Sequence, residues 1–261
     1  MADDLALAIE MAHRAGVILE EGFRKRENVS VDYKGARDPV TEIDRASEAF
    51  LRREIGRARP GDRVLGEEEG EGDSSAEGAR RWIVDPLDGT VNFMHGHPVF
   101  AVSIALEVEG RIEAGVVHAP LLGETFSAAR GDGAFRSDKR MSVSKTPALE
   151  KALLATGFAY QRSKTGGNNL DNFGRLSLAS LGVRRMGAAA LDLAWTAAGI
   201  FDGFWELGLA PWDVAAGALL VQEAGGRVSA FDGGAAWLFG RNIVASNGAI
   251  HDDIRGNLSS V

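Results

Sequence analysis

The N-terminal part of the chain carries apolar residues at the spacing of a helix. Asp3 and Asp4 precede this stretch and can cap a helix, and the pattern ends near Gly22. The shared apolar face comprises Leu5, Ile9, Ala12, Gly16 and Leu19. We therefore expect an amphipathic N-terminal helix that packs on the rest of the protein.

A second helical pattern begins at Thr41. Asp44 follows it, so the Thr41 side chain can cap the helix while carboxylates occupy its first turn. The apolar positions are Ile43, Ala46, Phe50 and Ile55. Residues 70–80 lack periodicity and apolar content, and we interpret them as a solvated surface loop.

From residue 81 onward the pattern changes to that of strands. An apolar run over 82–84 leads into Asp85, and an alternating stretch over 99–108 is followed by the Glu109-Gly110 turn and a returning strand over 112–117. This arrangement is typical of a hairpin. A turn at 130–133 indicates that the antiparallel sheet continues, and we expect another strand further on, over 153–156.

The second half of the chain alternates strands with helices. We expect a strand over 183–186, a helix over about 188–198 that ends at Gly199, a strand over 204–206, and a helix that begins at Pro211. This alternation predicts sheets covered by layers of helices, an α+β or α/β layered fold.

Composition narrows the class of protein. The 261 residues are 45% hydrophobic and 25% charged, as in an ordinary globular protein. A net charge of -8 argues against a nucleic-acid surface. The absence of cysteine excludes disulfides, thiolate zinc sites and cysteine nucleophiles. The acidic N-terminus and the lack of a long apolar run predict a cytoplasmic protein without a membrane segment.

The densest chemical signal is the segment 85–90, Asp-Pro-Leu-Asp-Gly-Thr, which follows a short apolar strand. Pro86 fixes one backbone angle and Gly89 permits a tight turn, so the two carboxylates can converge. Such oxygen ligands suit Mg²⁺ or Mn²⁺ better than zinc. A helix starting after Gly89 would present the Gly89 and Thr90 amides to phosphate. In isolation the segment also fits a plain turn.

Three other acidic residues stand in distinctive settings but have simpler explanations. Glu67 follows an apolar pair, yet it can belong to a solvated acidic run over 67–69. Asp213 lies on the first turn of an apolar helix, where it can merely favour the helix dipole. Glu206 can be an exposed strand residue.

Further polar residues leave alternatives open. The His95-x-His97 pair is interpreted as a loop or packing feature, because no carboxylate or cysteine accompanies it. Lys34, in a basic segment, fits a surface turn or a mobile flap over phosphate. Arg184 and Arg185 fit either the mouth of a substrate site or a contact between subunits.

In order and spacing, five motifs of the chain resemble the inositol monophosphatase family. They are Asp38-Pro39-Val40-Thr41-Glu42-Ile43-Asp44, Gly66-Glu67-Glu68, Asp85-Pro86-Leu87-Asp88-Gly89-Thr90-Val91-Asn92-Phe93, Arg185-Met186-Gly187-Ala188-Ala189-Ala190-Leu191-Asp192 and Trp212-Asp213-Val214-Ala215-Ala216-Gly217. The resemblance runs from about Asp4 to Asn247. Several interlocking motifs are far more specific than one.

The resemblance implies a metal site. Glu67, Asp85 and the Leu87 carbonyl would hold one Mg²⁺, and Asp85, Asp88 and Asp213 a second. A third, weaker ion would lie near Glu67. The expected cofactor is therefore Mg²⁺, two or three ions per active site, with Mn²⁺ as a possible substitute.

The resemblance also implies catalytic and substrate-binding residues. Asp44 and Thr90 would orient the attacking water, with Glu67 as the metal ligand beside them. The residues expected to contact the substrate are Asp88, Gly89, Thr90, Gly187, Ala188, Ala189, Glu206 and Asp213. Among these, the Gly89 and Thr90 amides would bind phosphate oxygens.

The fold implied by the resemblance is an αβαβα sandwich, of the type shared with fructose-1,6-bisphosphatase. Residues 1–261 would form a single domain. Its N-terminal half, about 1–145, would carry a large antiparallel sheet, and its C-terminal half, about 146–261, a smaller mixed sheet. A homodimer and inhibition by lithium are further features that the family implies.

We therefore expect a metal-dependent phosphoric monoester hydrolase that releases phosphate from a small phosphorylated polyol, foremost myo-inositol monophosphate, with a metal-activated water. Asp85 and Asp88 are three residues apart, whereas the nucleophile and acid of an aspartyl-phosphate phosphatase are two apart. Two alternatives remain: a phosphatase for histidinol phosphate or fructose 1,6-bisphosphate on the same frame, and a regulatory binding protein with secondary phosphatase activity.

Overall fold

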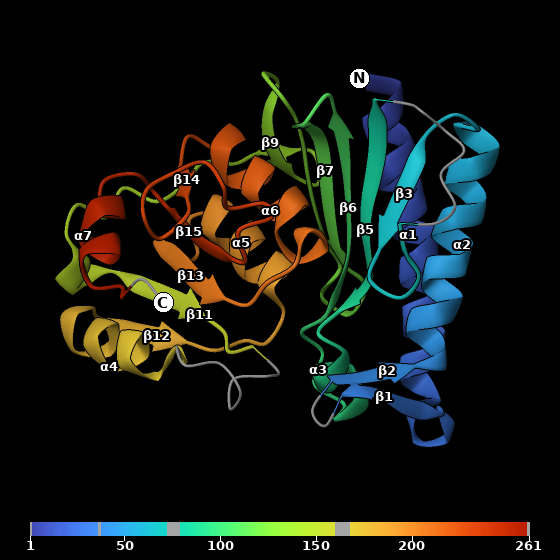
Figure 1. Ribbon diagram of the computed structural model, residues 1–261, viewed down its shortest axis with the longest axis horizontal. Coiled ribbons are helices and arrows are strands. Elements are labelled where there is room, and N and C mark those ends of the chain that lie inside the picture. Colours follow the sequence, from blue (N-terminus) through green and yellow to red (C-terminus); the bar gives the residue numbers. More distant parts are fainter. Residues whose placement is uncertain (1, 36–37, 72–78, 160–167, 260–261) are drawn as a thin grey trace.

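The structure is a computed structural model that describes residues 2–35, 38–71, 79–159 and 168–259. Five layers follow one another across Figure 1, with an eight-stranded and a five-stranded sheet between three layers of helices. The helical layers are α1 (Ala2–Arg24) with α2 (Glu42–Ala58), α5 (Ala189–Ala197) with α6 (Pro211–Glu223), and α4 (Leu170–Ala179) with α7 (His251–Gly256). The layered α/β fold and the αβαβα order are thus confirmed.

Helices α1 and α2 cover the outer face of the eight-stranded sheet (Figure 1). The buried face of α1 includes Ala12, Gly16 and Leu19, which belong to the apolar face expected from the sequence. Helix α2 begins where the Thr41 hydroxyl accepts hydrogen bonds from the amides of Ile43 (3.1 Å) and Asp44 (3.3 Å). The chain enters α2 from the hairpin β1 (Val31–Gly35) and β2 (Asp38–Thr41), which follows the short 3-10 helix η1 (Arg26–Asn28).

The eight-stranded sheet has the order β10-β9-β8-β7-β6-β5-β3-β4. Its strands are β3 (Arg63–Gly66), β4 (Gly70–Glu71), β5 (Arg80–Asp88), β6 (Ala101–Val108), β7 (Arg111–Ala119), β8 (Glu124–Ala129), β9 (Gly133–Arg136) and β10 (Lys139–Arg140). All neighbours pair antiparallel except β3 and β5, which run parallel. The parallel pair brings the carboxyl ends of β3 and β5 to the same edge of the sheet.

The five-stranded sheet has the order β12-β11-β13-β15-β14. Its strands are β11 (Leu153–Thr156), β12 (Gly182–Arg184), β13 (Gly203–Leu207), β14 (Arg227–Ser229) and β15 (Asn242–Ser246). Strand β11 pairs parallel with both β12 and β13, so the strand expected over 153–156 belongs to this second sheet. Strand β15 pairs antiparallel with β13 and β14.

Helices α5 and α6 are enclosed between the two sheets, which explains their composition. Every residue of α5 is buried, and small side chains let the two helices approach closely. A Cβ atom on Gly217 of α6 would lie 2.5 Å from Leu193 Cβ of α5, and one on Gly115 of β7 would lie 3.0 Å from Ala216 Cα. This close packing holds α6 against both α5 and the first sheet.

The remaining elements are short. Helix α3 (Thr90–Met94) follows β5, and the 3-10 helices η2 (Pro120–Leu122) and η3 (Leu149–Lys151) lie in connections. The surface loop expected over 70–80 begins in β4 and ends in β5, and its residues 72–78 lie outside the described residues. No helix within the described ranges is both long and apolar enough to cross a membrane.

Candidate active site

The segment 85–90 forms the end of β5 and the turn into α3. Between Asp85 and Asp88, β5 has one more residue than its partner β6, so the strand bulges and changes direction there. Gly89 then adopts a φ of 97°, and a Cβ atom on it would lie 3.0 Å from the Val99 carbonyl oxygen. Only glycine fits this turn without strain. The α3 helix begins directly after it, at Thr90, as expected.

Glu67 lies beside Asp85 because β3 and β5 are parallel neighbours. Gly66, the last residue of β3, is in register with Val84, so Glu67 and Asp85 directly follow a paired position. Glu67 is the first residue of the turn that joins β3 to β4. The Lys34 ammonium group donates a hydrogen bond to Glu67 Oε1 at 3.1 Å.

Asp88 connects the first sheet to the middle helices. Its Oδ2 accepts a hydrogen bond from the Ala190 amide at 2.8 Å, and its Oδ1 accepts one from the Ala189 amide at 3.2 Å. These amides belong to the first turn of α5, whose dipole favours a negative charge there. The interaction places the 187–189 segment directly beside the end of β5.

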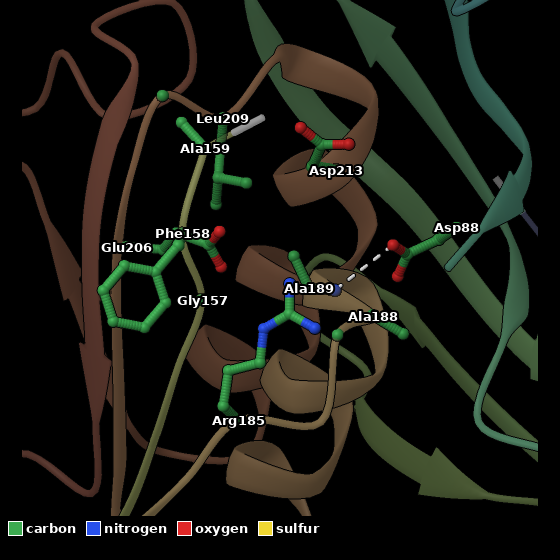
Figure 2. Close-up of a pocket in the computed structure, with 12 residues that line it drawn as sticks. Asp88, Gly157, Phe158, Ala159, Arg185, Ala188, Ala189, Glu206, Leu209 and Asp213 are labelled. Atoms are coloured by element: carbon green, nitrogen blue, oxygen red, sulfur yellow. Dashed lines mark hydrogen bonds between the residues drawn. The ribbon is translucent and has the colours of Figure 1, made fainter. Parts of the chain in front are cut away.

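Asp213 lies on the first turn of α6, two residues after Pro211. Its Oδ2 accepts a hydrogen bond from the Ala210 amide at 2.7 Å. Asp213 is therefore an acid at a helix N-terminus, as the simpler explanation has it. The same position also makes Asp213 part of the wall of a pocket, together with Asp88 (Figure 2).

Asp44 and Thr90 are brought into contact from α2 and α3. Thr90 Oγ1 lies 2.9 Å from Asp44 Oδ1 and 3.1 Å from the Leu87 carbonyl oxygen. Asp44 Oδ2 accepts hydrogen bonds from the Thr41 amide (2.8 Å) and hydroxyl (2.5 Å). Both Asp44 and Thr90 are buried, so their orientation is set by the fold rather than by solvent.

The pocket beside Asp88 opens between the ends of both sheets (Figure 2). Gly187, Ala188 and Ala189 form one wall, and Gly157 and Phe158 after β11 form another. Glu206 of β13 points into it and is 7% exposed, which excludes the alternative of an exposed strand residue. A Cβ atom on Gly157 would overlap Glu206 Oε2, so the absence of a side chain there makes room for this carboxylate.

Two arginines that sequence reasoning left open are separated by the structure. Arg185 lines the pocket, and Figure 2 shows its guanidinium between Glu206 and Asp88. Arg184 is exposed on β12, where its Nη1 donates to the Val183 carbonyl. His95 and His97 are exposed in the stretch after α3, and His97 Nδ1 accepts a hydrogen bond from the Val99 amide.

The carboxylates of the site repel one another in a poorly solvated environment. Burial raises the pKa of Glu67 to about 8. The Lys34 charge opposes this shift, and the Asp213 charge adds to it. Burial raises the pKa of Asp85 well above its ordinary value, and the charges of Glu67 and Asp88 add to the effect. Burial also raises the pKa of Asp88 to about 7, although amide hydrogen bonds oppose it. A bound cation would remove this repulsion.

Two further buried acids, Glu206 and Asp192, also have raised pKa values. Burial raises the pKa of Glu206, the Asp213 charge raises it further, and the Arg185 guanidinium opposes the shift. Asp192 of α5, which carried no expected role, is buried, and its pKa is raised by burial and by the Glu206 charge. Its Oδ1 has no hydrogen-bond partner among the described residues.

The oxygen ligands at this site are of the type that a hard divalent cation binds. In the arrangement described, no three His, Cys, Asp or Glu side chains converge closely enough to coordinate an ion. Glu67 is drawn to Lys34 and Asp213 to the Ala210 amide. The side-chain donors are nevertheless all carboxylate oxygens, of which those of Asp85 and Asp88 are buried and repel one another, and oxygen ligands are those that Mg²⁺ and Mn²⁺ prefer.

Comparison with known proteins identifies the family. The model of the Inositol monophosphatase family matches residues 1–260. The chain belongs to the inositol monophosphatase family. Members of this family are phosphatases, generally metal-dependent, that act on small phosphorylated substrates. The resemblance noted from five motifs is thus confirmed over nearly the whole chain.

Relatives within the inositol monophosphatase family bear two kinds of name. The chain is 47% identical to "Nus factor SuhB" of Pseudomonas aeruginosa, over 93% of this chain and 91% of the relative. It is 45% identical to "Inositol-1-monophosphatase" of Mesorhizobium japonicum, over 94% and 92% of the two chains. The extragenic suppressor protein suhB from Bartonella henselae has a similar structure, with a TM-score of 0.92, 42% identity and 99% coverage of both chains.

Proposed function

We propose that this protein hydrolyses a small phosphomonoester in the presence of Mg²⁺, with myo-inositol monophosphate as the preferred substrate. The observation that carries the proposal is the position of Glu206. A buried carboxylate lines a pocket together with Asp88, which directly precedes the turn at Gly89. A carboxylate in that place can accept hydrogen bonds from two ring hydroxyls of a polyol.

The carboxylates of the turn would hold the ions. Glu67, Asp85 and the Leu87 carbonyl are the proposed ligands of one Mg²⁺, and Asp85, Asp88 and Asp213 those of a second, with a weaker third ion near Glu67. The bound metals would supply an activated water and neutralise negative charge on the phosphate and the leaving oxygen. Mn²⁺, which takes the same oxygen ligands, would substitute.

The protein's own groups would position the attacking water and the phosphate. Asp44 is held by Thr41, and its Oδ1 accepts the Thr90 hydroxyl proton, so the free lone pairs of both groups can accept hydrogen bonds from a water and hold it in one direction. The Gly89 and Thr90 amides at the start of α3 would bind phosphate oxygens. No covalent intermediate is required.

The alcohol portion would occupy the pocket that Figure 2 shows. Glu206 and Asp213 would accept hydrogen bonds from its hydroxyls, and the 187–189 segment would contact the ring. Arg185 can donate to hydroxyl oxygens on the same side of the pocket. Because acidic groups outnumber this arginine, a neutral polyol fits the pocket better than a ring with a second phosphate.

A substrate panel tests the proposal. Phosphate release would be measured from inositol 1-phosphate, histidinol phosphate and fructose 1,6-bisphosphate, with Mg²⁺, with chelator, and with added lithium. We expect Mg²⁺-dependent, lithium-sensitive release that is fastest from inositol 1-phosphate. A higher kcat/KM for either competitor would replace the substrate and keep the metal site, whereas release that persists in chelator would refute the metal-dependent mechanism.

A second function deserves a direct test because the chain is 47% identical to a protein named a Nus factor. We infer that a binding role in transcription can coexist with phosphatase activity. An Asp44→Asn chain, deficient in catalysis, would be compared with the unchanged chain in cells that lack the protein. Rescue of growth by both would show that the essential role is binding, and rescue by the unchanged chain alone would show that it is catalysis.

We further propose that the protein is a homodimer. The strand β12 lies at the edge of the second sheet, and apolar side chains are exposed beside it: Leu178 is 92% exposed and Leu181 is 72% exposed. Exposed apolar side chains next to an open sheet edge fit a surface between subunits. Light scattering should give twice the chain mass, and Leu178→Asp together with Leu181→Asp should reduce it to the mass of one chain.

A further inference from the structure

Glu67 lies next to a short strand pairing, which gives its backbone little support. It begins a three-residue turn, 67–69, and β4 on the far side of the turn is only two residues long. A metal ligand has to be held within a fraction of an ångström, so something else must fix this turn. The surrounding side chains show what does so.

Glu48 of α2 binds the backbone of the turn. Its Oε2 accepts a hydrogen bond from the Glu68 amide at 2.8 Å, and its Oε1 accepts one from the Glu69 amide at 3.0 Å. Glu48 is 0% exposed, so these charge-assisted bonds do not compete with water. The two amides that follow Glu67 are therefore fixed by one buried carboxylate.

Arg52, one helical turn further along α2, holds Glu48 and the hairpin together. Its Nε donates to Glu48 Oε1 at 2.8 Å. Its Nη2 donates to the Gly70 carbonyl at 2.5 Å, and its Nη1 to the Val64 carbonyl at 3.3 Å. The guanidinium thus bonds to β3 and β4 at once while it neutralises Glu48. This arrangement lets a carboxylate remain buried close to the other acids.

Gly66 shows that the fit is tight. A Cβ atom at this position would overlap the Glu48 carboxylate, although Gly66 has an ordinary backbone conformation. Glu48 is therefore packed directly against the residue before Glu67. Both of its oxygens accept hydrogen bonds from the turn or from Arg52, so the contacts of Glu48 are those of a positioning residue.

We propose that Glu48 is a positioning residue that fixes Glu67 for metal binding, with Arg52 as its anchor. This inference rests on the metal-dependent function proposed above. It assigns to α2 a second contribution to the site besides Asp44: the N-terminus of the helix would orient the water, and the next turn would orient a ligand. Groups of this kind, hydrogen-bonded behind the ligands, commonly change metal affinity by about 10-fold to 100-fold when they are altered.

The test is the affinity for Mn²⁺ of Glu48→Gln, measured by the electron paramagnetic resonance of the free ion and independently of turnover. Glutamine keeps the size of the side chain but turns an amino group toward Arg52 or toward a turn amide, where two donors face each other. We expect the Kd for Mn²⁺ to rise about 10-fold. The Mg²⁺ concentration for half-maximal phosphate release should rise by a similar factor.

Two further variants separate positioning from general destabilisation. Glu107→Gln is the matched control, because Glu107 of β6 is also a buried glutamate paired with an arginine, Arg81 at 2.6 Å, but it bonds no residue of the turn. It should leave the Mn²⁺ affinity unchanged. Gly66→Ala keeps every charge yet displaces the Glu48 carboxylate, and should weaken Mn²⁺ binding as Glu48→Gln does.

The outcomes are distinct. Weaker binding in Glu48→Gln and Gly66→Ala, but not in Glu107→Gln, supports the inference even if no substrate in the panel is hydrolysed, in which case only the proposed function fails. Equal affinity in Glu48→Gln and the unchanged chain overturns it. So does an equal loss in Glu107→Gln, or the absence of Mn²⁺ binding by the unchanged chain.

Discussion

Thr90 Oγ1 lies 2.9 Å from Asp44 Oδ1 and so joins the first turn of α2 to the first turn of α3. The two residues are 46 positions apart in the chain, and each is buried. Burial raises the pKa of Asp44, while hydrogen bonds from Thr41 and Thr90 lower it. The carboxylate is consequently poised between two helix starts, where it can orient a small polar molecule.

This contact leads to the first prediction. Asp44→Asn should lower kcat for phosphate release about 100-fold, because the amide NH2 group would face the Thr41 or Thr90 donors and the pair would no longer hold the attacking water in place. Thr90→Ser retains the hydroxyl and should stay within about 10-fold of the unchanged chain. Stopped assays at saturating Mg²⁺ would measure both. A loss in Asp44→Asn that disappears at higher Mg²⁺ would instead assign Asp44 to metal binding.

Gly157 provides a second prediction. Alanine at this position would push the Glu206 carboxylate out of the pocket, since the added Cβ atom would overlap Glu206 Oε2. KM for inositol 1-phosphate should rise about 10-fold, and hydrolysis of p-nitrophenyl phosphate, which has no ring hydroxyls, should change little. Gly174→Ala is the matched control, because a Cβ atom there meets nothing within 4 Å. Equal losses for the two substrates would refute the role given to Glu206.

Asp88 supports a prediction about chelator. Its folded pKa is about 7, above its ordinary value of 3.8, so the folded state binds the proton more tightly and loses stability as pH rises from about 4 through 7. In chelator, raising the pH from 4 to 8 should therefore cost the unchanged chain more stability than Asp88→Asn, which has no carboxylate to deprotonate at this position. Mg²⁺ at pH 8 should stabilise the unchanged chain more than Asp88→Asn, because the variant has lost a proposed ligand. Thermal melts of both proteins, in chelator and in Mg²⁺, would measure the two differences, and equal shifts in both proteins would contradict this role of Asp88.

His251 gives the fourth prediction. It is buried, with its ring nitrogens 2.9 Å from the hydroxyls of Ser229 and Ser246, and burial lowers its pKa from 6.5 to about 4. The unfolded chain binds the proton more readily, so the stabilisation is complete above pH 6.5 and is lost as pH falls toward 4. It amounts to roughly 2–3 kcal/mol.

Urea unfolding of the unchanged chain and of His251→Asn would test this between pH 7.5 and 4.5. The difference in free energy of unfolding between the two should shrink as pH falls, because only the unchanged chain has this buried imidazole to protonate. The active-site carboxylates give a pH dependence of opposite sign. It is the same in both proteins, so it cancels when one free energy of unfolding is subtracted from the other. A difference that stays constant over this range would contradict a lowered His251 pKa.

Local patterns were enough to predict much of the fold. The helix start at Thr41, the turn at Gly89 and the helix start at Pro211 are each dictated by residues within one turn of the backbone, and all three occur in the structure as expected. The strand over 153–156 was recognised, but its parallel neighbours depend on segments about 30 and 50 residues later, which no local pattern encodes.

The candidate site divides in the same way. The sequence marks Asp85 and Asp88 by their turn, and Glu67 and Asp213 by resemblance. It gives no comparable sign for Glu48. This residue looks like any acidic residue on a helix surface until the fold places the 67–69 turn against it. Its role arises from packing between distant segments.

The same limit applies to the pocket. Gly157 follows a strand as many glycines do, and Arg185 fitted two locations equally well. Only the three-dimensional arrangement shows that Gly157 leaves space for Glu206 and that the Arg185 guanidinium lies opposite it (Figure 2). A second arginine next to it in the sequence, Arg184, is on the surface.

The bonds from Asp88 to the first amides of α5 have a consequence for hydrogen exchange. The Ala189 and Ala190 amides lie at a helix start, where no preceding carbonyl of the helix would shield them, and their protons would normally exchange quickly. With Asp88 as acceptor they should exchange only when the sheet and the helix separate. The exchange rates of these two amides therefore report, without any substrate, how often the middle layer of the protein opens.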